Sequence, residues 1–551
     1  MKRTAKNLSL ILSVILVLSM LLSSCGIIGN IFGGGKEEES ASETDVIDTG
    51  KETEADTNSA ETVEDASDSA EDTDSDALDS EENTDSDVES EEETDEETEE
   101  ETEEIPELDV KDLNGREILV RWPSIHGDGH YVHNEIAPIN TTGDVIDMAV
   151  ATRNTIVERK YNVIITSEEV WVSDIVKDIR TNAMASTQVD YSAAVSTIKF
   201  MTEVAQEGWL YDFGEFTNYD EAHPWWNNDL MDDFSIAGSR YFATGDIIYS
   251  DDFYPYCTYV NLGVSDQNQL EDNYYDLVAN KEWTLEEFHT RAKTVVSADY
   301  NVDCNEWGDA EVAGAVVNEN FARATYYSAG KGMIELNAMG YPTWQMSVAY
   351  TSPILDKVIH IVHDNNACYN AGQWKDHAIR EVNLFNTNKT LFLVEELIIA
   401  ERITKSEEPA DFKILPFPLY EEGGDYISVL NDAAVLAIPV TTEEADDVCL
   451  VLSAMSCESM ETLTPAFFET VLASRYVQDA GSVETLEIIL SSTVAPDVAT
   501  IQDWGGFMKE FKRLAFANST DFASYHDGNI SVVTGEIQNY KDILDVHHGR
   551  A

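Results

Sequence analysis

The stretch GDVIDMAVATRNTIVERKYNVII, residues 143–165, changes from a helical pattern to a strand pattern without a break. Its apolar side chains first recur three and four positions apart, which is the spacing of one face of an α-helix. The residues with this spacing are Val145, Ile146, Ala149, Val150, Ile156 and Val157. The apolar run that ends the stretch is typical of a strand. A helix that leads directly into a strand indicates an α/β fold.

The flanking segments continue this alternation of strands and helices. Residues 116–122 (REILVRW) predict a strand before the helix, and residues 172–186 predict a second helix. A buried strand is expected at 189–197, followed by a helix that ends near Gly208. Strands that alternate with helices are typical of a sheet with crossover helices.

The later part of the chain gives the same two patterns. Strands are predicted at 240–250, 256–264, 411–418 and 433–439, the last two ended by prolines, and helices at 283–298, at 442–456 and from there to the C-terminus. In the helix at 283–298, Thr284 is expected to be the N-cap. Glu287 follows it three positions later, which is the spacing of a capping box.

The first 25 residues have the pattern of a membrane-targeting segment. Three basic residues within the first six positions precede an apolar run at 8–22. This run is too short for a transmembrane span and predicts a signal peptide at 1–24. It ends in LSSC, which resembles the bacterial lipobox. The resemblance implies that Cys25 carries the acyl chains, palmitate among them, and anchors the protein at the extracellular face of the cell membrane.

The acidic residues are concentrated behind this segment. The chain has a formal net charge of −73, and 34 of its acidic residues lie between 36 and 104, among serines and threonines. Such a composition cannot bury enough apolar surface to offset the entropy of ordering. We therefore expect the lipidated N-terminus to continue as a disordered acidic linker over 25–106. The rest of the chain is also acidic, which excludes a nucleic-acid partner because phosphate backbones would be repelled.

The five other cysteines form no C-x-x-C pair. A structural zinc site of that type is therefore not expected, and an odd number does not indicate a disulfide framework. We interpret Cys257, Cys304, Cys368, Cys449 and Cys457 as small buried hydrophobic residues.

From about Leu108 to Val546 the sequence resembles an extracellular solute-binding protein of an ABC transporter, of the carbohydrate type (family 1-like), found as lipoproteins in Gram-positive bacteria. The segments that carry the resemblance are NEIAPINTTGDVIDMAVATRNTIVERKYNV (134–163), EGWLYDF (207–213), HPWWNNDLMDDFSIAGSRYFATGDI (223–247), YVNLGV (259–264), KEWTLEEFHTRAKTVVSAD (281–299), DFKILPFPLYEEGGDYISVLNDAAVLAIPVTTEE (411–444) and ASRYVQDAGSVETLEIIL (473–490).

This resemblance implies an α/β chain with a two-lobed, periplasmic-binding-protein-like fold (type II) and a hinge between the lobes. Lobe 1 is expected at 107–243 and 417–462, and lobe 2 at 244–416 and 463–551. The implied function is capture of a carbohydrate, an oligosaccharide, by hinge closure and its delivery to the permease subunits of an ABC importer. The resemblance implies a monomer without catalytic activity and without a cofactor.

Candidate ligand-binding residues follow from the chemistry of sugars, which offer apolar C–H faces to aromatic rings and hydroxyl groups to polar side chains. The candidates are Trp225, Trp226, Asp251, Asp252, Tyr254, Phe321, Tyr327, Trp344, Trp504 and Thr197. The adjacent Trp225 and Trp226 are expected to point opposite ways, one inward and one toward the ligand. Thr197 ends a predicted strand, at the edge where α/β sheets bind ligands. Core packing is the alternative role for each aromatic residue.

Two metal patterns leave other functions open. HGDGHYVH (126–133) places three histidines close together, as a zinc site would require. Asp299, Asn301 and Asp303 alternate as in a calcium-binding loop, but Cys304 stands where that loop needs glycine. The alternatives are a surface-anchored glycan-active or metal-dependent hydrolase, and an adhesive or peptide-binding descendant of the same fold. The sequence contains no G-x-S-x-G, P-loop or H-E-x-x-H motif.

The lipobox resemblance leads to a direct prediction. The Cys25→Ala variant lacks the acylated thiol, so it is expected to leave the membrane fraction and appear in the soluble fraction, as measured by cell fractionation and immunoblotting. Ser24→Ala, which retains the cysteine, serves as the matched control. Continued partition of Cys25→Ala with membranes would contradict the assignment.

Overall fold

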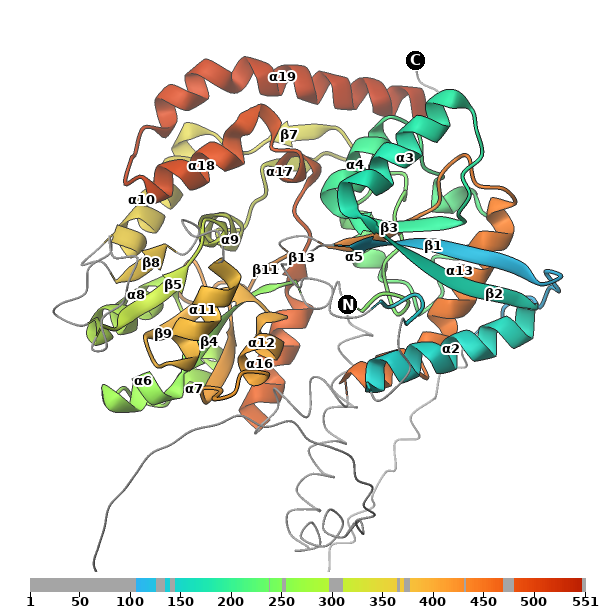
Figure 1. Cartoon of the computed structure of the whole chain (residues 1–551). Helices are drawn as coiled ribbons and strands as arrows, with labels where there is room; N and C mark the ends of the chain where they lie inside the picture. The colour runs from blue at the N-terminus through green and yellow to red at the C-terminus, as the bar shows by residue number, and fades with distance from the viewer. Residues whose placement is uncertain are drawn as a thin grey trace, which may run out of the picture. The chain divides into compact units, whose positions relative to one another are not determined.

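Two β-sheets and the helices packed on them organise the chain (Figure 1). The computed structural model describes residues 106–124, 134–138, 144–236, 238–249, 254–296, 311–363, 367–370, 377–430, 433–468 and 480–547. Cys25, the linker predicted at 36–104 and the histidine pattern at 126–133 lie outside the described residues. Among those that are described, no helix has the length and apolar character needed to cross a membrane.

The first sheet has four strands in the order β12-β3-β1-β2. Its strands are β1 (Arg116–Ser124), β2 (Val163–Trp171), β3 (Ala193–Thr197) and β12 (Ala434–Ala437). β1 runs parallel to β2 and β3, whereas β12 pairs with β3 in the antiparallel direction. The three parallel strands therefore end at the same edge of the sheet, where Thr197 lies.

The helices between these strands follow the predicted order, and α2 leads directly into β2 as expected. α2 (Val145–Tyr161) starts at Asp144, whose carboxylate accepts hydrogen bonds from the amides of Ile146 and Asp147. It ends at Asn162 in the left-handed conformation, directly before β2. α3 (Val172–Ala185) follows β2, and α4 (Ile198–Gln206) follows β3 without a loop.

These helices cover both faces of the first sheet. α3 and α4 lie on one face, and α2 and α13 (Ala445–Ser459) lie on the other (Figure 1). The apolar face predicted for 145–157 is correct at Ile146, Val150 and Val157, which are buried. Val145 and Ile156 are exposed, so the buried face of α2 is narrower than its apolar spacing indicated.

The second sheet has five strands in the order β10-β4-β9-β5-β8. They are β10 (Phe412–Pro416), β4 (Tyr256–Asn261), β9 (Thr390–Glu396), β5 (Ala313–Val317) and β8 (Cys368–Asn370). β5 is parallel to β8 and β9, and β4 is antiparallel to both β9 and β10. The carboxyl ends of β5 and β9 therefore meet at one edge of this sheet.

The remaining elements complete the described part of the chain. The helices are α5 (Asn228–Asp233), α6 (Leu262–Gln267), α7 (Tyr274–Ala279), α8 (Leu285–Val295), α9 (Asn320–Ser328), α10 (Val348–His363), α11 (His377–Asn386), α12 (Ile399–Thr404), α14 (Leu463–Ala466), α16 (Ala480–Ser491), α17 (Val498–Ile501), α18 (Phe507–Phe516) and α19 (Phe522–His547), with 3₁₀ turns η2 (Phe213–Glu215) and η7 (Trp504–Gly506). Two short sheets pair β6 (Ile334–Leu336) with β7 (Pro342–Trp344) and β11 (Ser428–Val429) with β13 (Thr493–Val494).

The strand predicted at 240–250 is wrong as a regular strand. This segment makes isolated bridges, among them Gly245 with Trp226 and with Ile248. Gly245 has φ +135°, and a Cβ there would lie 2.2 Å from the carbonyl oxygen of Trp225. The close approach of the two backbones therefore requires glycine and interrupts regular pairing.

The predicted helix cap is confirmed, whereas one strand end and one cysteine differ from the prediction. The cap of α8 is confirmed, because the Thr284 hydroxyl accepts a hydrogen bond from the Glu287 amide at 3.2 Å. The strand predicted at 256–264 ends early at Asn261, whose side chain caps α6 by accepting from the Val264 amide. The predicted burial of cysteines is confirmed for Cys257, Cys368 and Cys449, while Cys457 is half-buried and Cys304 lies outside the described residues.

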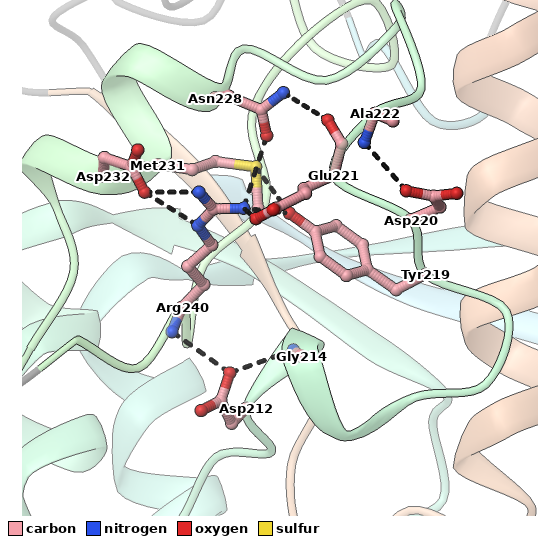
Figure 2. Close-up of polar contacts among 10 residues, drawn as sticks. All are labelled: Asp212, Gly214, Tyr219, Asp220, Glu221, Ala222, Asn228, Met231, Asp232 and Arg240. Carbon is pink, nitrogen blue, oxygen red and sulfur yellow. Dashed lines mark hydrogen bonds and ion pairs between the residues drawn. The ribbon is translucent and has the colours of Figure 1, made fainter.

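A polar hub around Arg240 holds the segment that carries Trp225 and Trp226 (Figure 2). The Arg240 guanidinium donates to Asp232 at 2.8 Å, to the Tyr219 hydroxyl at 3.0 Å and to Glu221 at 2.8 Å. Its backbone N–H donates to Asp212, which also accepts from the Gly214 amide. One half-buried cation thereby joins residues 212–221 to residues 228–240.

Substitution of Arg240 is expected to lower the free energy of unfolding. Arg240→Met keeps the apolar stem and removes the charged hydrogen bonds, so we expect the free energy of unfolding to fall by about 2 kcal/mol. Arg180→Met is the matched control, because the Arg180 side chain is 34% exposed against 16% for Arg240, so its ion pairs with Glu203 and Glu207 should contribute less than about 1 kcal/mol. Urea denaturation followed by circular dichroism measures both. Equal losses would contradict the special role of Arg240.

Candidate functional site

A cavity of about 690 Å³ lies between α4 and the elements near the C-terminus. We call it the α4–α19 cavity. Its polar and aromatic lining residues are Lys199, Glu203 and Gln206 from α4, Gln502, Asp503 and Trp504 from the turn after α17, and Glu536, Asn539 and Tyr540 from α19. α4 begins at the carboxyl end of β3, so one wall continues the edge of the first sheet where α/β folds bind ligands.

The lining combines two kinds of group that suit a polyhydroxylated ligand. The rings of Trp504 and Tyr540 line the cavity wall edge to face, with centroids 5.9 Å apart and 3% and 1% of their surface exposed. Carboxylates, amides and one ammonium group supply acceptors and donors around them. Its size is within the range of small-molecule sites, so the cavity can hold a ligand of several rings or a chain of similar length.

The two walls of the cavity are joined by side-chain amides. The Gln502 amide donates to the Gln206 carbonyl oxygen at 2.9 Å. The Trp504 indole N–H donates to the Gln502 carbonyl oxygen at 3.1 Å. Through these two bonds, α4 fixes the position of Trp504, whose orientation in turn shapes the cavity.

A buried network places α17, and with it Gln502, against α9. The Tyr327 hydroxyl lies 2.8 Å from the Thr500 hydroxyl and 3.1 Å from the Asp497 carboxylate. Asp497 also caps α17 by accepting from the Thr500 amide at 2.8 Å. A Cβ on Gly332 would lie 2.1 Å from the same carboxylate, so only glycine leaves room for it. Tyr327, a predicted ligand residue, therefore has a structural role here.

A group of charged side chains lies beside the cavity. Burial, followed by the charge of Arg323, lowers the pKa of Lys512 to about 8, while Glu319 and Asp503 raise it and Lys199 lowers it further. The Lys512 ammonium donates to the Asn320 side-chain oxygen at 3.0 Å. Because Lys199 and Asp503 also line the cavity, this charged cluster extends from α18 and α9 to the cavity wall.

Two buried carboxyl groups, one from α11 and one from β9 of the second sheet, lie next to each other. Glu381 of α11 and Glu395 of β9 are 1% and 6% exposed. Burial raises the pKa of Glu381 to about 7, and burial together with the charges of Glu381 and Glu396 raises the pKa of Glu395 well above its ordinary value. The Asn318 amide donates to Glu395, and the Tyr256 hydroxyl donates to Asn318 at 3.2 Å. This pair is too enclosed to reach a glycan, so it does not support the hydrolase alternative.

The structure places the two adjacent tryptophans together in the core. Trp225 is 0% and Trp226 is 4% exposed, so both indoles are buried, and contact of one of them with a ligand stays a prediction. Trp225 stacks on His223 with ring centroids 4.2 Å apart, and Trp226 packs against Phe213 and Tyr219. They line a separate, small cavity of about 50 Å³.

Most of the other aromatic candidates also pack inside the protein. Phe321 is fully buried between Phe288 and Phe417, and Tyr254 is buried. Trp344, half-buried in β7, packs edge-on against Phe507 at 5.0 Å and lines neither cavity.

Of the predicted ligand residues, Trp504 lines the α4–α19 cavity. Thr197 is buried at the end of β3, two residues before Lys199, and does not itself line the cavity. Asp251, Asp252, Asp299, Asn301 and Asp303 lie outside the described residues.

Several lining residues were missed by the sequence reasoning. Lys199 lies two positions after Thr197, the end of the predicted strand, so its place near the sheet edge was a signal that the sequence contained. Gln502 lies two positions before Trp504 and offered a weaker signal. Asn539 lies on an exposed face of α19, where nothing in the local pattern distinguishes it from other polar residues.

Comparison with known proteins finds similar structures but no similar sequence family. No family model and no curated protein matches the sequence. Among solved structures, the cyclic alpha-maltosyl-1,6-maltose binding protein from Arthrobacter globiformis matches with 13% identity and a TM-score of 0.53, over 77% of this chain and 100% of that one. UspC of M. tuberculosis matches with 12% identity and a TM-score of 0.51, over 76% and 99%.

At such low identity, the likeness shows the fold alone. The predicted fold class is confirmed: the chain is mixed α/β and has the two-lobed, periplasmic-binding-protein-like fold. The strands of the two sheets fall within the ranges expected for lobe 1 and lobe 2 respectively, while the lobe boundaries themselves stay a prediction.

The buried carboxyl pair predicts a pH dependence of stability. The pKa of Glu381 rises from 4.5 to about 7 on folding, so between these values the folded state holds more protons than the unfolded state. The contribution is complete below about pH 4.5 and is lost as the pH rises through about 7. It amounts to about 3 to 4 kcal/mol at most, since one pKa unit corresponds to about 1.4 kcal/mol.

Urea denaturation at several pH values measures this effect. Glu381→Gln stays neutral and is expected to flatten the fall in unfolding free energy between about pH 5 and about pH 8. Glu271→Gln, which changes an exposed carboxylate, should keep the slope of the parent chain. If Glu381→Gln and the parent lose stability equally over this interval, the pair does not titrate as described.

Proposed function

We propose that the protein is an extracellular solute-binding protein that captures an oligosaccharide in the α4–α19 cavity and delivers it to an ABC importer. The observation that carries this proposal is the lining of the cavity, which places Trp504 and Tyr540 among side-chain amides and carboxylates. Aromatic rings contact the C–H faces of a sugar, and the polar groups around them bind its hydroxyls.

The fold supports the same function. The Arthrobacter globiformis protein of this fold is a binding protein for a cyclic maltosyl-maltose. Binding proteins of this architecture close two lobes around a ligand, and the walls of the α4–α19 cavity come from the two ranges expected for lobe 1 and lobe 2. The Gln206–Gln502 bond joins those walls and is suited to strengthen a closed state.

The N-terminal pattern supports a location outside the cell. The lipobox-like LSSC and the acidic stretch behind it fit a lipid anchor at Cys25 with a spacer that holds the binding domain away from the membrane. An anchored binding protein stays close to the permease subunits that receive its ligand.

Ligand binding is testable with the purified full-length chain. We expect neutral oligosaccharides, linear and cyclic, to raise its melting temperature without being cleaved. At a ligand concentration a hundredfold above Kd, the stabilisation would be about 2.7 kcal/mol. Gln502→Ala and Asn539→Ala each remove hydrogen-bonding groups from the cavity, so each should weaken the affinity by roughly 2- to 10-fold in isothermal titration calorimetry.

The matched control lies on the same helix. Gln538 neighbours Asn539 but donates to Asp542 at 2.8 Å and does not line the cavity. Gln538→Ala should therefore bind as the parent does. Release of shorter sugars would favour the hydrolase alternative, and a response to peptides with none to glycans would contradict the carbohydrate assignment.

A further inference from the structure

Two histidines and one glutamate converge on the outer side of the second sheet. Glu286 and His289 lie three positions apart on α8, so their side chains share one helix face. His360 comes from α10, which packs against α8. The ligand atoms of the three side chains lie within 4.8 Å of one another.

The spacing of these atoms is close to that of a metal site. Zinc binds imidazole nitrogen and carboxylate oxygen at about 2.0–2.2 Å, so two ligands of a four-coordinate ion lie roughly 3.3 Å apart. Small side-chain rotations would close the present separation to that value. The imidazole rings of His289 and His360 already meet edge to face, with centroids 4.8 Å apart.

The three side chains of the cluster differ in their exposure to solvent. His289 is buried and fixed by the packing around it, whereas Glu286 and His360 are exposed. An ion can therefore enter from solvent and settle on a preset imidazole. The strongly negative charge of the chain also raises the local concentration of cations.

One neighbouring cation bears on the site. Lys357 lies one turn before His360 on α10, and the charge of Glu286 acts on it. Its ammonium donates to the Tyr420 carbonyl oxygen at 2.6 Å and lies 3.9 Å from the centroid of the Tyr420 ring. Lys357 is thus held by Tyr420, and Glu286 keeps its carboxylate for a second cation.

We propose that Glu286, His289 and His360 form a binding site for a first-row divalent transition-metal ion, of which Zn²⁺ is the best match. Two imidazoles and one carboxylate are the ligand types that zinc uses, and water completes the coordination. The bound ion ties α8 to α10. None of the three residues lines the α4–α19 cavity, so the site is separate from the proposed sugar site.

The test is a titration of the metal-free, full-length chain with Zn²⁺. We expect one tight site per chain in isothermal titration calorimetry and a rise in melting temperature. Co²⁺ in the same site should give the visible absorption bands of a four-coordinate ion. Loss of an outer-shell partner of a metal typically costs 10- to 100-fold in affinity, so His360→Ala and Glu286→Gln, which remove direct ligands, should each cost about 100-fold or more.

Two controls keep the outcome interpretable. His363→Ala removes another imidazole of α10, one that contacts the Ala515 carbonyl oxygen at 2.8 Å, and should leave the affinity for Zn²⁺ unchanged. His360 and Glu286 are exposed, so their variants should fold, as an unchanged melting temperature without metal would verify. Every variant retains the acidic stretch at 36–104, so weak binding of cations there cancels in the comparison.

Two results would overturn the proposal. One is the absence of a tight Zn²⁺ site in the parent chain. The other is equal Zn²⁺ affinity in the parent, His360→Ala and Glu286→Gln. Because sugar binding is measured with other variants and another ligand, either result leaves the proposed transport function unaffected.

Discussion

The carboxylate of Asp497 accepts hydrogen bonds from four groups on three elements. They are the amide of Thr500 on α17, the amides of Met333 and Ile334 at β6, and the hydroxyl of Tyr327 on α9. Burial raises the pKa of this carboxyl, and the hydrogen bonds act in the opposite direction. A buried carboxylate is tolerated when donors surround it, and here the donors come from segments that must therefore meet at one point.

The hydrogen bonds of Asp497 determine the shape of the α4–α19 cavity through two further contacts. With α17 fixed against α9, the following turn places Gln502 within reach of Gln206, and Trp504 within reach of Gln502. Each link in this series is an amide, hydroxyl or carboxylate with a partner of the opposite kind. The cavity wall thus depends on a polar network that the apolar core alone would not specify.

Features of the fold that depend on residues close together in the sequence could be predicted, whereas features that depend on distant residues could not. The end of α2 directly before β2 and the Thr284 cap of α8 arise from residues within a few positions of each other, and both were predicted. Strands β5 and β9 were not singled out, because short apolar runs do not distinguish a strand from a buried helix. The irregular segment at Gly245 depends on a contact with Trp225, twenty residues earlier.

The sequence by itself determined the α/β alternation, the two-lobed fold class and the acidic character of the chain, since these follow from local spacing, from family likeness and from composition. The tertiary structure decided which cavity each of the buried tryptophans lines. Trp504 lines the α4–α19 cavity while Trp225 and Trp226 line the small cavity of about 50 Å³, although all three had the same chemistry in the sequence. The physical reason is distance along the chain: residues 199–206 and 502–540 form one site because the buried network at Asp497 brings α17 to α9 and the Gln206–Gln502 bond joins α4 to it.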